Sequence, residues 1–398
     1  MATTLTEHKV TPTTMIRPRL DSVDMLRGVV MVLMVLDHTR DFFYEAKFDP
    51  TDPTQTTVAL FFTRWVTHFC APLFVFLAGS GAYLAGARGK SKPELAWFLL
   101  TRGLWLVVLE LTVVRVALTF NPRSPVLLAT TLWAIGWSMV GLSALVFLPL
   151  PVIAAFGIVT MAAHNLLDGV NPESLGRWRA AWIVLHQPGQ VQLPGGWILF
   201  VAYPLVPWVG VIAAGYAFGR LLLLEPARRR RVLLTLGLAL TLAFVALRAS
   251  NLYGDPRPWT AQKSDLFTAL SFLNCLKYPF SLLFLLMTLG PGIAALALLD
   301  RPTGKLTRPI LIFGRVPLFF YLLQWPVLHV LAIAMALANG RKVDWLFKSF
   351  FPGTPPGYGF GLPTVYLMWL VVLVLLYPAC RWFAGVKQRR RDAWLSYL

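Results

Sequence analysis

The sequence predicts an all-α protein, a bundle of about ten helices that span a membrane. Of the 398 residues, 57% are hydrophobic and only 14% are charged, and the mean hydropathy is +0.64. Apolar blocks recur along the whole chain, and each has roughly the 20 residues that a helix needs to cross a bilayer. A soluble protein of this length needs far more surface charge. The chain is therefore predicted to be a polytopic membrane protein.

The predicted spanning helices are mostly separated by proline, glycine or charged residues, as expected where helices leave a membrane. In chain order the ten predicted spans are Val23–Tyr44, Val58–Gly86, Leu95–Phe120, Val126–Val146, Pro149–Leu167, Trp197–Leu222, Val232–Arg248, Tyr278–Leu299, Ile310–Leu337 and Leu362–Phe383. Pro317 and Pro326 predict that the ninth segment is bent or broken. We expect one integral-membrane domain over residues 21–385, between tails of residues 1–20 and 386–398, and no cleavable signal peptide.

The net charge of +18 comes from basic residues in the loops between the apolar blocks. All of the basic clusters fall on one side if ten helices span the membrane, and the positive-inside rule makes that side cytoplasmic. The clusters are Arg17 and Arg19; Arg88, Lys90 and Lys92; Arg228 to Arg231; Arg301, Lys305 and Arg308; and Lys387 with Arg389 to Arg391. Both termini are then cytoplasmic, and the charge needs no nucleic-acid partner to explain it.

The first predicted helix contains the run LRGVVMVLMVLDHTRDFF, which carries several ionisable residues. A charged group in hydrocarbon costs at least a few kcal/mol, so these residues are expected to face the interior of the bundle. Residues eleven positions apart return to nearly the same face, and their separation along the axis is about 16 Å. One polar-ended stripe is therefore predicted, with Asp37 and Arg40 beside it; its members are Asp24, Arg27, Met31, Met34, His38 and Asp41.

His38 is the predicted general base of a catalytic site, because an imidazole can take up a proton near neutral pH. Asp37 or Asp41 is expected to orient the ring and stabilise its charged form. His68, one helical turn after Arg64 in the second segment, is a second candidate. The alternative is that these residues form only a charge network between helices.

Several longer segments resemble a known family. The run RLDSVDMLRGVVMVLMVLDHTRDFF and the later HFCAPLFVFLAGSGAYL resemble the start of the heparan-α-glucosaminide N-acetyltransferase-like membrane proteins. The segments LNCLKYPFSLLFLLMTLG and FGRVPLFFYLLQWPVLH resemble the bacterial branch of that family. The spacing of Arg27 and His38 also resembles a motif of bacterial membrane acyltransferases that modify cell-surface polysaccharides.

The resemblance implies a multispan acyltransferase in a bacterial inner membrane. It would take an acetyl or other acyl group from acetyl-CoA in the cytoplasm and transfer it to an amine or hydroxyl of a sugar or cell-envelope compound on the far side. One departure matters, because the lysosomal enzyme of the family has its catalytic histidine between the first two helices, in a His-Ala-Ser-Trp-Asn-Gly context. The loop here reads YEAKFDPTDPTQTTVAL and has no histidine. The role would then fall to His38 or His68.

The resemblance also implies a donor site and an acceptor site. Arg27 is expected to hold the phosphates of the donor, and Arg315 is a second candidate for that contact. The residues expected to bind substrate are Asp24, Arg40, Asn274, Lys277, Tyr278, Gln324 and His329. Lys277 could bind an acidic or carbonyl group. The simpler alternative is that it lies at the membrane surface and extends its side chain to water.

Acetyl-CoA is the expected acyl donor, and no metal is expected, since no HExxH motif, His/Cys cluster or carboxylate pair is found. Other partners would be a small-molecule or glycan acceptor and membrane lipids. The sequence also leaves open whether the protein forms a homodimer. The predicted surface histidines are His8, His164 and His186. The residues predicted to be buried or closely packed are Cys70, Cys275, Cys380, Gly79, Gly81 and Gly86.

Two other function classes remain open at this level. A proton-coupled transporter would use the stripe that contains Asp37, His38 and Asp41 as a proton relay. Such transporters often carry internal hydropathy repeats, and none is obvious here. A membrane scaffold without catalysis would tolerate the loss of His38.

Overall fold

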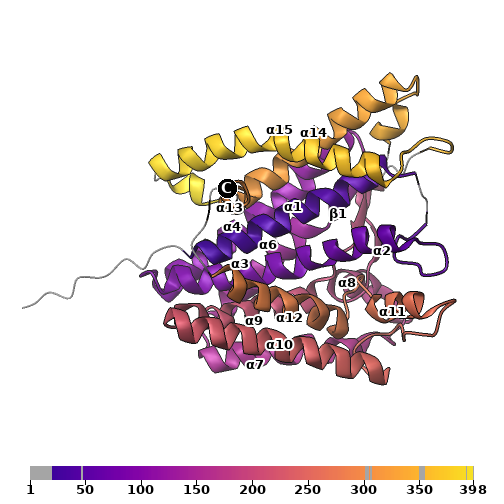
Figure 1. Cartoon of the computed structure of the whole chain (residues 1–398). Coiled ribbons are helices and arrows are strands. Elements are labelled where there is room, and N and C mark those ends of the chain that lie inside the picture. Colours follow the sequence, from indigo (N-terminus) through magenta and orange to yellow (C-terminus); the bar gives the residue numbers. More distant parts are fainter. Residues whose placement is uncertain are drawn as a thin grey trace, which may run out of the picture.

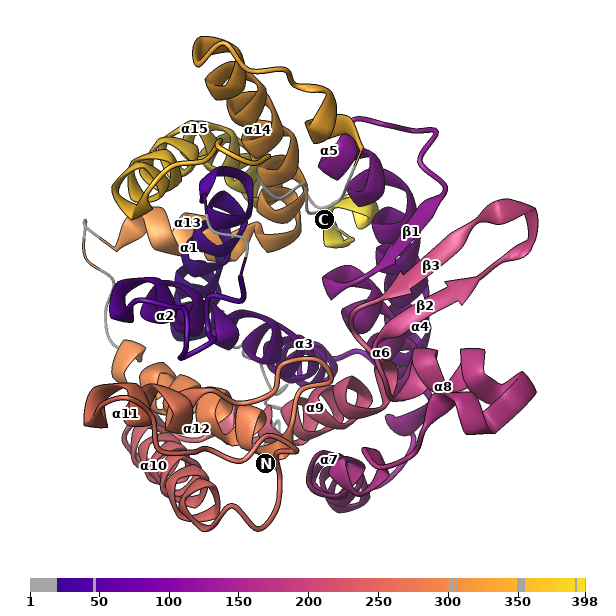
Figure 2. The same cartoon turned by 90° about the vertical axis from the view of Figure 1, so that its right-hand side faces the viewer.

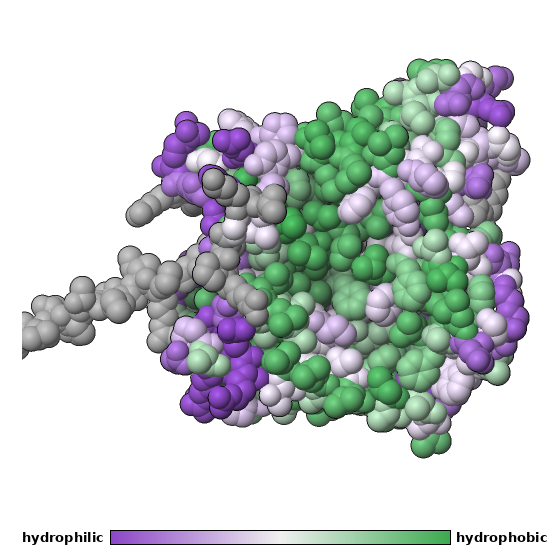
Figure 3. All heavy atoms as spheres, in the orientation of Figure 1, coloured by the Kyte–Doolittle hydropathy of each residue, from purple (hydrophilic) through white to green (hydrophobic). Residues whose placement is uncertain are grey.

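The computed structural model describes residues 20–45, 48–300, 304, 307–348, 355–390 and 392–397. It is a bundle of long helices that run between two opposite ends of the molecule (Figure 1). Hydrophilic side chains gather at those two ends, and a broad apolar band lies between them (Figure 3). The predicted residues that lie outside the described part of the chain are His8, Arg17, Arg19, Arg301, Lys305 and Arg391.

Fifteen α-helices are found in the described residues. They are α1 (Asp21–Phe43), α2 (Val58–Trp65), α3 (Cys70–Gly86), α4 (Lys92–Leu109), α5 (Arg115–Thr119), α6 (Thr131–Leu145), α7 (Leu150–Ala163), α8 (Arg179–Leu185), α9 (Leu205–Phe218), α10 (Pro226–Ser250), α11 (Asp265–Leu273), α12 (Leu282–Leu299), α13 (Arg308–Arg315), α14 (Pro317–Ala338) and α15 (Leu362–Arg389).

The predicted fold class is confirmed. Within the described residues, eight helical segments are long and apolar enough to cross a membrane, and each corresponds to one of the predicted spans. The two other predicted spans contain α1, which has 23 residues and several charges, and α6, an apolar helix of 15 residues. The protein is therefore an integral membrane protein with many spans.

Two of the predicted spans begin too early, because their first residues form strands. Strand β1 (Val126–Ala129) pairs in parallel with β3 (Ile198–Val201), and β2 (Gly189–Gln192) pairs with β3 in the antiparallel sense. Short aliphatic runs of this kind are compatible with a strand and with a helix. Periodicity alone therefore does not distinguish the two, and β1 and β3 are distant from each other in sequence. Figure 2 shows this small sheet beside α8, at one edge of the bundle.

Three long segments are interrupted in ways that matter for the site. The predicted second span consists of α2, the 3₁₀ turn η1 (Val66–Phe69) and α3, and the third contains a π-helical stretch, η2 (Glu110–Val114). The ninth breaks between α13 and α14 at Val316, whose φ of −131° and ψ of 50° are not helical. The break directly precedes Pro317, as predicted, whereas Pro326 lies inside α14.

Glycines allow helices of the core to pack at backbone distance. A Cβ on Gly79 of α3 would lie 2.1 Å from the carbonyl oxygen of Ile212 in α9, and one on Gly215 would lie 2.1 Å from that of Phe76. The predicted close packing is confirmed for this helix pair. Gly81 differs, because a Cβ there would meet the guanidinium of Arg27 at 3.1 Å.

The described parts of both termini lie at the same end of the bundle. Asp21, at the start of α1, and Gln388, near the end of α15, line one cavity together with Arg315. The hydroxyl groups of Tyr397 and Thr101 are 2.8 Å apart, which joins the C-terminal residues to α4. The three cysteines are buried, as predicted, and all three are free.

Candidate active site

Helix α1 brings the predicted polar stripe into the centre of the bundle. It packs against α3, α12, α13, α14 and α15, so most of its faces are covered by protein (Figure 2). A continuous helix from Asp21 to Phe43 places Arg27 and His38 about 16 Å apart along its axis. The two residues line different cavities, and these cavities are neighbours.

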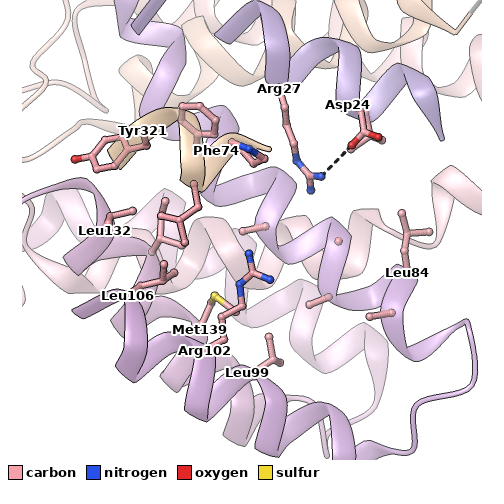
Figure 4. Close-up of a pocket in the computed structure, with 18 of the residues that line it drawn as sticks. Asp24, Arg27, Phe74, Leu84, Leu99, Arg102, Leu106, Leu132, Met139 and Tyr321 are labelled. Carbon is pink, nitrogen blue, oxygen red and sulfur yellow. Dashed lines mark hydrogen bonds and ion pairs between the residues drawn. The ribbon is translucent and has the colours of Figure 1, made fainter. Parts of the chain in front are cut away.

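The first cavity, here called the basic cavity, has a volume of about 370 Å³. Its cationic residues are Arg27 of α1, Arg88 after α3 and Arg102 of α4, and most of its other walls are apolar. The guanidinium groups of Arg27 and Arg102 enter it from opposite sides (Figure 4). Arg27 also donates a hydrogen bond of 2.9 Å to the carbonyl of Leu77 and lies 3.5 Å from the carboxylate of Asp24.

The second cavity, here called the histidine cavity, is much smaller, about 30 Å³. His38 and Lys277 line it, although they are 239 positions apart in the chain. The other lining residues are Met34, Asp37, Thr67, Cys70, Ala71, Phe74, Thr131 and Tyr203. A space of this size holds about one water molecule, so it fits a reacting group and not a whole substrate.

The two cavities share part of their walls. Phe74 of α3 and Thr131 of α6 line both of them, and the stripe of α1 passes from one to the other through Met31 and Met34. Thr131 is held in place through its neighbour, because the amide of Thr130 donates a hydrogen bond of 3.1 Å to the buried carboxylate of Glu110. A molecule bound in the basic cavity is thus separated from His38 by a few side chains.

The ring of His38 stacks on Trp325 of α14, with 4.0 Å between the ring centroids and 29° between the planes. Its Nδ1 is buried and has no hydrogen-bond partner among the described residues. Gln324, the neighbour of Trp325, is fully buried, and within the described chain its amide nitrogen and oxygen are unpaired as well. Buried polar atoms usually have partners, so these groups point to a site that binds a polar ligand or water.

The two carboxylates next to His38 are engaged by arginines. Arg40 lies 2.7 Å from Asp37 and 2.6 Å from Asp41, and Arg64 of α2 forms a very short ion pair with Asp37. In the part of the chain that the structure describes, neither carboxylate forms a hydrogen bond with His38. The ring of His38 stacks on Trp325 and Arg40 pairs with both carboxylates, so an orienting role of Asp37 or Asp41 stays a prediction.

Lys277 and Tyr203 supply hydrogen-bond donors to the histidine cavity. Tyr203 follows β3 and is 8% exposed. Burial raises the pKa of Tyr203 well above its ordinary value, and the neighbouring phenol of Tyr278 adds to the effect. Tyr203 therefore stays protonated and can donate a hydrogen bond. Tyr278 packs edge-on against Tyr203 at 5.6 Å and is itself 37% exposed.

Four further predicted site residues line neither of the two cavities, namely His68, Arg315, Asn274 and His329. His68 is 3% exposed and packs on Phe284, and its neighbour Thr67 takes the place on the cavity wall. Arg315 lines a different cavity, where it bonds to Asp21 at 3.1 Å.

Asn274 donates a hydrogen bond of 2.9 Å to the carbonyl of Thr51, so it ties two loops together. His329 is fully buried, donates a hydrogen bond of 2.9 Å from Nδ1 to the carbonyl of Leu118, and stacks on Phe120. Both contacts are structural in kind. The substrate-binding roles predicted for Asn274 and His329 stay predictions.

Arg102, Thr131, Tyr203 and Trp325 line or support the cavities and were not predicted as site residues. Each comes from a different part of the chain, and of the four only Trp325 lies in a segment quoted above for its family resemblance, FGRVPLFFYLLQWPVLH. The sequence signal that was available is weak, namely an arginine in the middle of an apolar segment for Arg102.

A many-spanning helix bundle with a basic cavity next to a partly buried histidine defines an integral membrane protein with a candidate site inside the bundle. A model of the family described as heparan-alpha-glucosaminide N-acetyltransferase, catalytic, matches residues 19–253. This match covers more than half of the 398 residues, and the chain therefore belongs to that family. Membership assigns it a membrane acetyltransferase-like function. No curated protein matches the chain.

The matched region contains the basic cavity's arginines together with His38, His68 and Tyr203. It ends before Lys277 and before α14, which carries Trp325 and Gln324. The histidine cavity is thus completed by residues outside the matched region.

Proposed function

We propose that the protein transfers an acyl group, most simply acetyl, from acyl-CoA in the cytoplasm to an acceptor on the other side of the membrane. The observation that carries this proposal is the pair of adjoining cavities, one lined by three arginines and the other by His38 and Lys277. The protein would reside in a bacterial inner membrane with both termini in the cytoplasm, where its basic loops are favoured.

The basic cavity suits the donor. Guanidinium groups bind phosphates through charge-assisted hydrogen bonds, and Arg27, Arg88 and Arg102 offer three of them. The apolar remainder of the cavity suits a flexible, largely uncharged arm that leads from those phosphates toward Phe74 and Thr131. When bound, acyl-CoA supplies a thioester, whose carbonyl carbon is open to attack by an amine or hydroxyl.

His38 acts as the general base. It accepts the proton that the acceptor loses as its nitrogen or oxygen bonds to the acyl carbon and the carbon–sulfur bond breaks. Lys277 and Tyr203 donate hydrogen bonds to the oxygen on which negative charge develops. Asp37 and Asp41, each paired with Arg40, balance the charge around the base without taking part in the proton transfer.

The acceptor is proposed to be an amine or hydroxyl of a sugar or cell-envelope compound. The histidine cavity is too small for a whole sugar, at about 30 Å³, so only the reacting group would enter it. The rest of the acceptor would lie toward Tyr278, which packs against Tyr203 and is partly exposed. Membrane lipids would surround the bundle along its apolar band (Figure 3).

The test uses purified full-length protein in detergent with radiolabelled acetyl-CoA and an amino sugar as acceptor. Transfer and slow hydrolysis are measured for the wild type, His38→Ala and His68→Ala, and CoA binding is measured separately. We expect His38→Ala to reduce transfer about 10²- to 10⁴-fold with CoA binding unchanged, and His68→Ala to remain active. Retained activity in His38→Ala would move the base to His68. A wild type that neither turns over nor binds CoA would contradict the proposed function.

A further inference from the structure

A second cluster of ionisable side chains lies away from both cavities, at the end of the bundle that holds the small sheet. His164 begins the 3₁₀ turn η3 (His164–Leu167) directly after α7, Asp168 follows that turn, and His186 follows α8. One ligand atom from each of the three residues lies within 4.8 Å of the other two. The Nε2 of His186 and the Oδ1 of Asp168 are 3.1 Å apart.

Both histidines are deeply buried, so the prediction that they are surface histidines is wrong. His164 is 3% exposed and His186 is 0% exposed. Among the described residues, neither ring nitrogen of His164 has a hydrogen-bond partner, and the Nδ1 of His186 has none either. Burying an unpaired polar nitrogen costs about 1–3 kcal/mol, so three of them in one place call for a ligand.

We propose that His164, Asp168 and His186 bind one divalent transition-metal ion of the zinc type. Two imidazoles and one carboxylate form a three-ligand zinc site with a fourth position for water. Ligand atoms at about 2.0–2.2 Å from a tetrahedral ion lie about 3.3–3.6 Å apart. The ligand atoms here lie within 4.8 Å of one another. Imidazole ligands favour zinc over magnesium or calcium, which prefer oxygen.

The surroundings of the cluster are those of a metal site. The amide of Asn165 donates a hydrogen bond of 2.8 Å to Asp168 Oδ2, the oxygen that does not contact His186. Such a second hydrogen bond fixes the orientation of a carboxylate ligand. His164 and His186 are also enclosed by the rings of Phe280 and Trp182, which limit access of water.

The ion would hold in place the helix ends at the end of the bundle that carries the small sheet. It would join the end of α7 to the end of α8, and Asn165 already accepts a hydrogen bond of 2.8 Å from Leu282 at the start of α12. Lys277 of the histidine cavity belongs to the loop that leads into α12. The site is therefore structural and is independent of whether the chain transfers acyl groups.

The experiment uses full-length protein with a purification tag that contains no histidine, dialysed against a chelator and then against trace Zn²⁺. Elemental mass spectrometry gives the zinc content, and thermal unfolding in detergent is followed with Zn²⁺ and with Mg²⁺. We expect one zinc per chain and a rise in the unfolding temperature with Zn²⁺ alone, since a ligand that binds the folded state stabilises it. The variants His164→Ala, His186→Ala and Asp168→Asn are expected to lose the bound zinc, whereas His38→Ala keeps it.

Addition of Co²⁺ to the wild type gives a readout that needs no variant, because tetrahedral Co²⁺ absorbs visible light and octahedral Co²⁺ absorbs weakly. We expect the absorption of a tetrahedral site. Wild-type protein that retains no zinc and shows no change in unfolding temperature would overturn the proposal. Equal zinc content in the wild type and in folded His164→Ala and His186→Ala would overturn it as well.

Discussion

The basic cavity and the histidine cavity adjoin each other but differ in size and chemistry. The basic cavity is about 370 Å³ and carries three arginines on mostly apolar walls, whereas the histidine cavity is about 30 Å³ and is lined largely by hydrogen-bonding groups. A large cationic cavity is suited to binding its ligand tightly, whereas a small polar cavity is suited to holding a few reacting atoms in the right orientation. The difference indicates that affinity for the donor and the chemical step depend on separate sets of residues.

The largest effect is expected on folding, from the ion pairs beside the base. Asp37→Ala leaves the buried Arg40 and the partly buried Arg64 without their shared carboxylate and should destabilise the protein by about 3–5 kcal/mol. The measurement is the unfolding midpoint in detergent. Asp344→Ala, which removes an exposed carboxylate, is the matched control and should change little. Equal stability of the two variants would mean that the network beside His38 contributes nothing to the fold.

The next effect is expected on the chemical step. Lys277→Met removes a donor from the histidine cavity and should lower kcat about 10²-fold while the affinity for CoA stays the same. Transfer kinetics and CoA binding are measured on the same preparation. Lys263→Met, in an exposed position outside both cavities, is the control. A change in CoA affinity of the same size would remove the distinction between the two cavities.

A smaller effect is expected from the basic cavity, where a substitution should change the affinity for CoA and not the chemical step. Arg102→Ala removes charge-assisted hydrogen bonds to the donor, each worth about 1.5–3 kcal/mol, so CoA affinity should fall about 10- to 150-fold. Calorimetric titration with CoA measures it, with Arg228→Ala in the exposed basic cluster as control. Should Arg102→Ala bind CoA like the wild type, the donor does not occupy this cavity.

The smallest effect is expected from filling the basic cavity without removing a charge. Gly81→Leu adds a side chain beside Arg27, where even a Cβ would lie 3.1 Å from the guanidinium, and overpacking of this kind costs about 1–3 kcal/mol. CoA binding should weaken about tenfold, measured by the same titration. Gly169→Leu is the control, because a Cβ there meets nothing within 4 Å. Unchanged binding in Gly81→Leu would place the donor away from α3.

The helical fold and the stripe of α1 were accessible from sequence because both depend on local periodicity. Apolar length predicts the spans, and the 3.6-residue period groups Asp24, Arg27, Met31, Met34 and His38, all of which line one of the two cavities. Asp41 shares that face but lies beyond the cavities and pairs with Arg40.

The remainder of the site was not accessible, because it depends on contacts between distant segments. Tyr203 follows β3, which pairs with β2 and also with β1, about 70 residues earlier in the chain. Trp325 meets His38 because of how α14 packs after its break at Val316. Arg315 stands on the preceding helix, α13, and that same break separates it from the residues that face the cavity.

Phe74 and Thr131, which line both cavities, also bear on how the membrane voltage acts on the reaction. A membrane voltage falls mostly across the layer that water does not enter, and moving one elementary charge through it costs about 2.3 kcal/mol per 100 mV. An acyl group is neutral and crosses that layer without this cost, whereas a proton does not. Turnover in sealed vesicles will be independent of voltage only if the proton that His38 accepts returns to the side of the departing thiol.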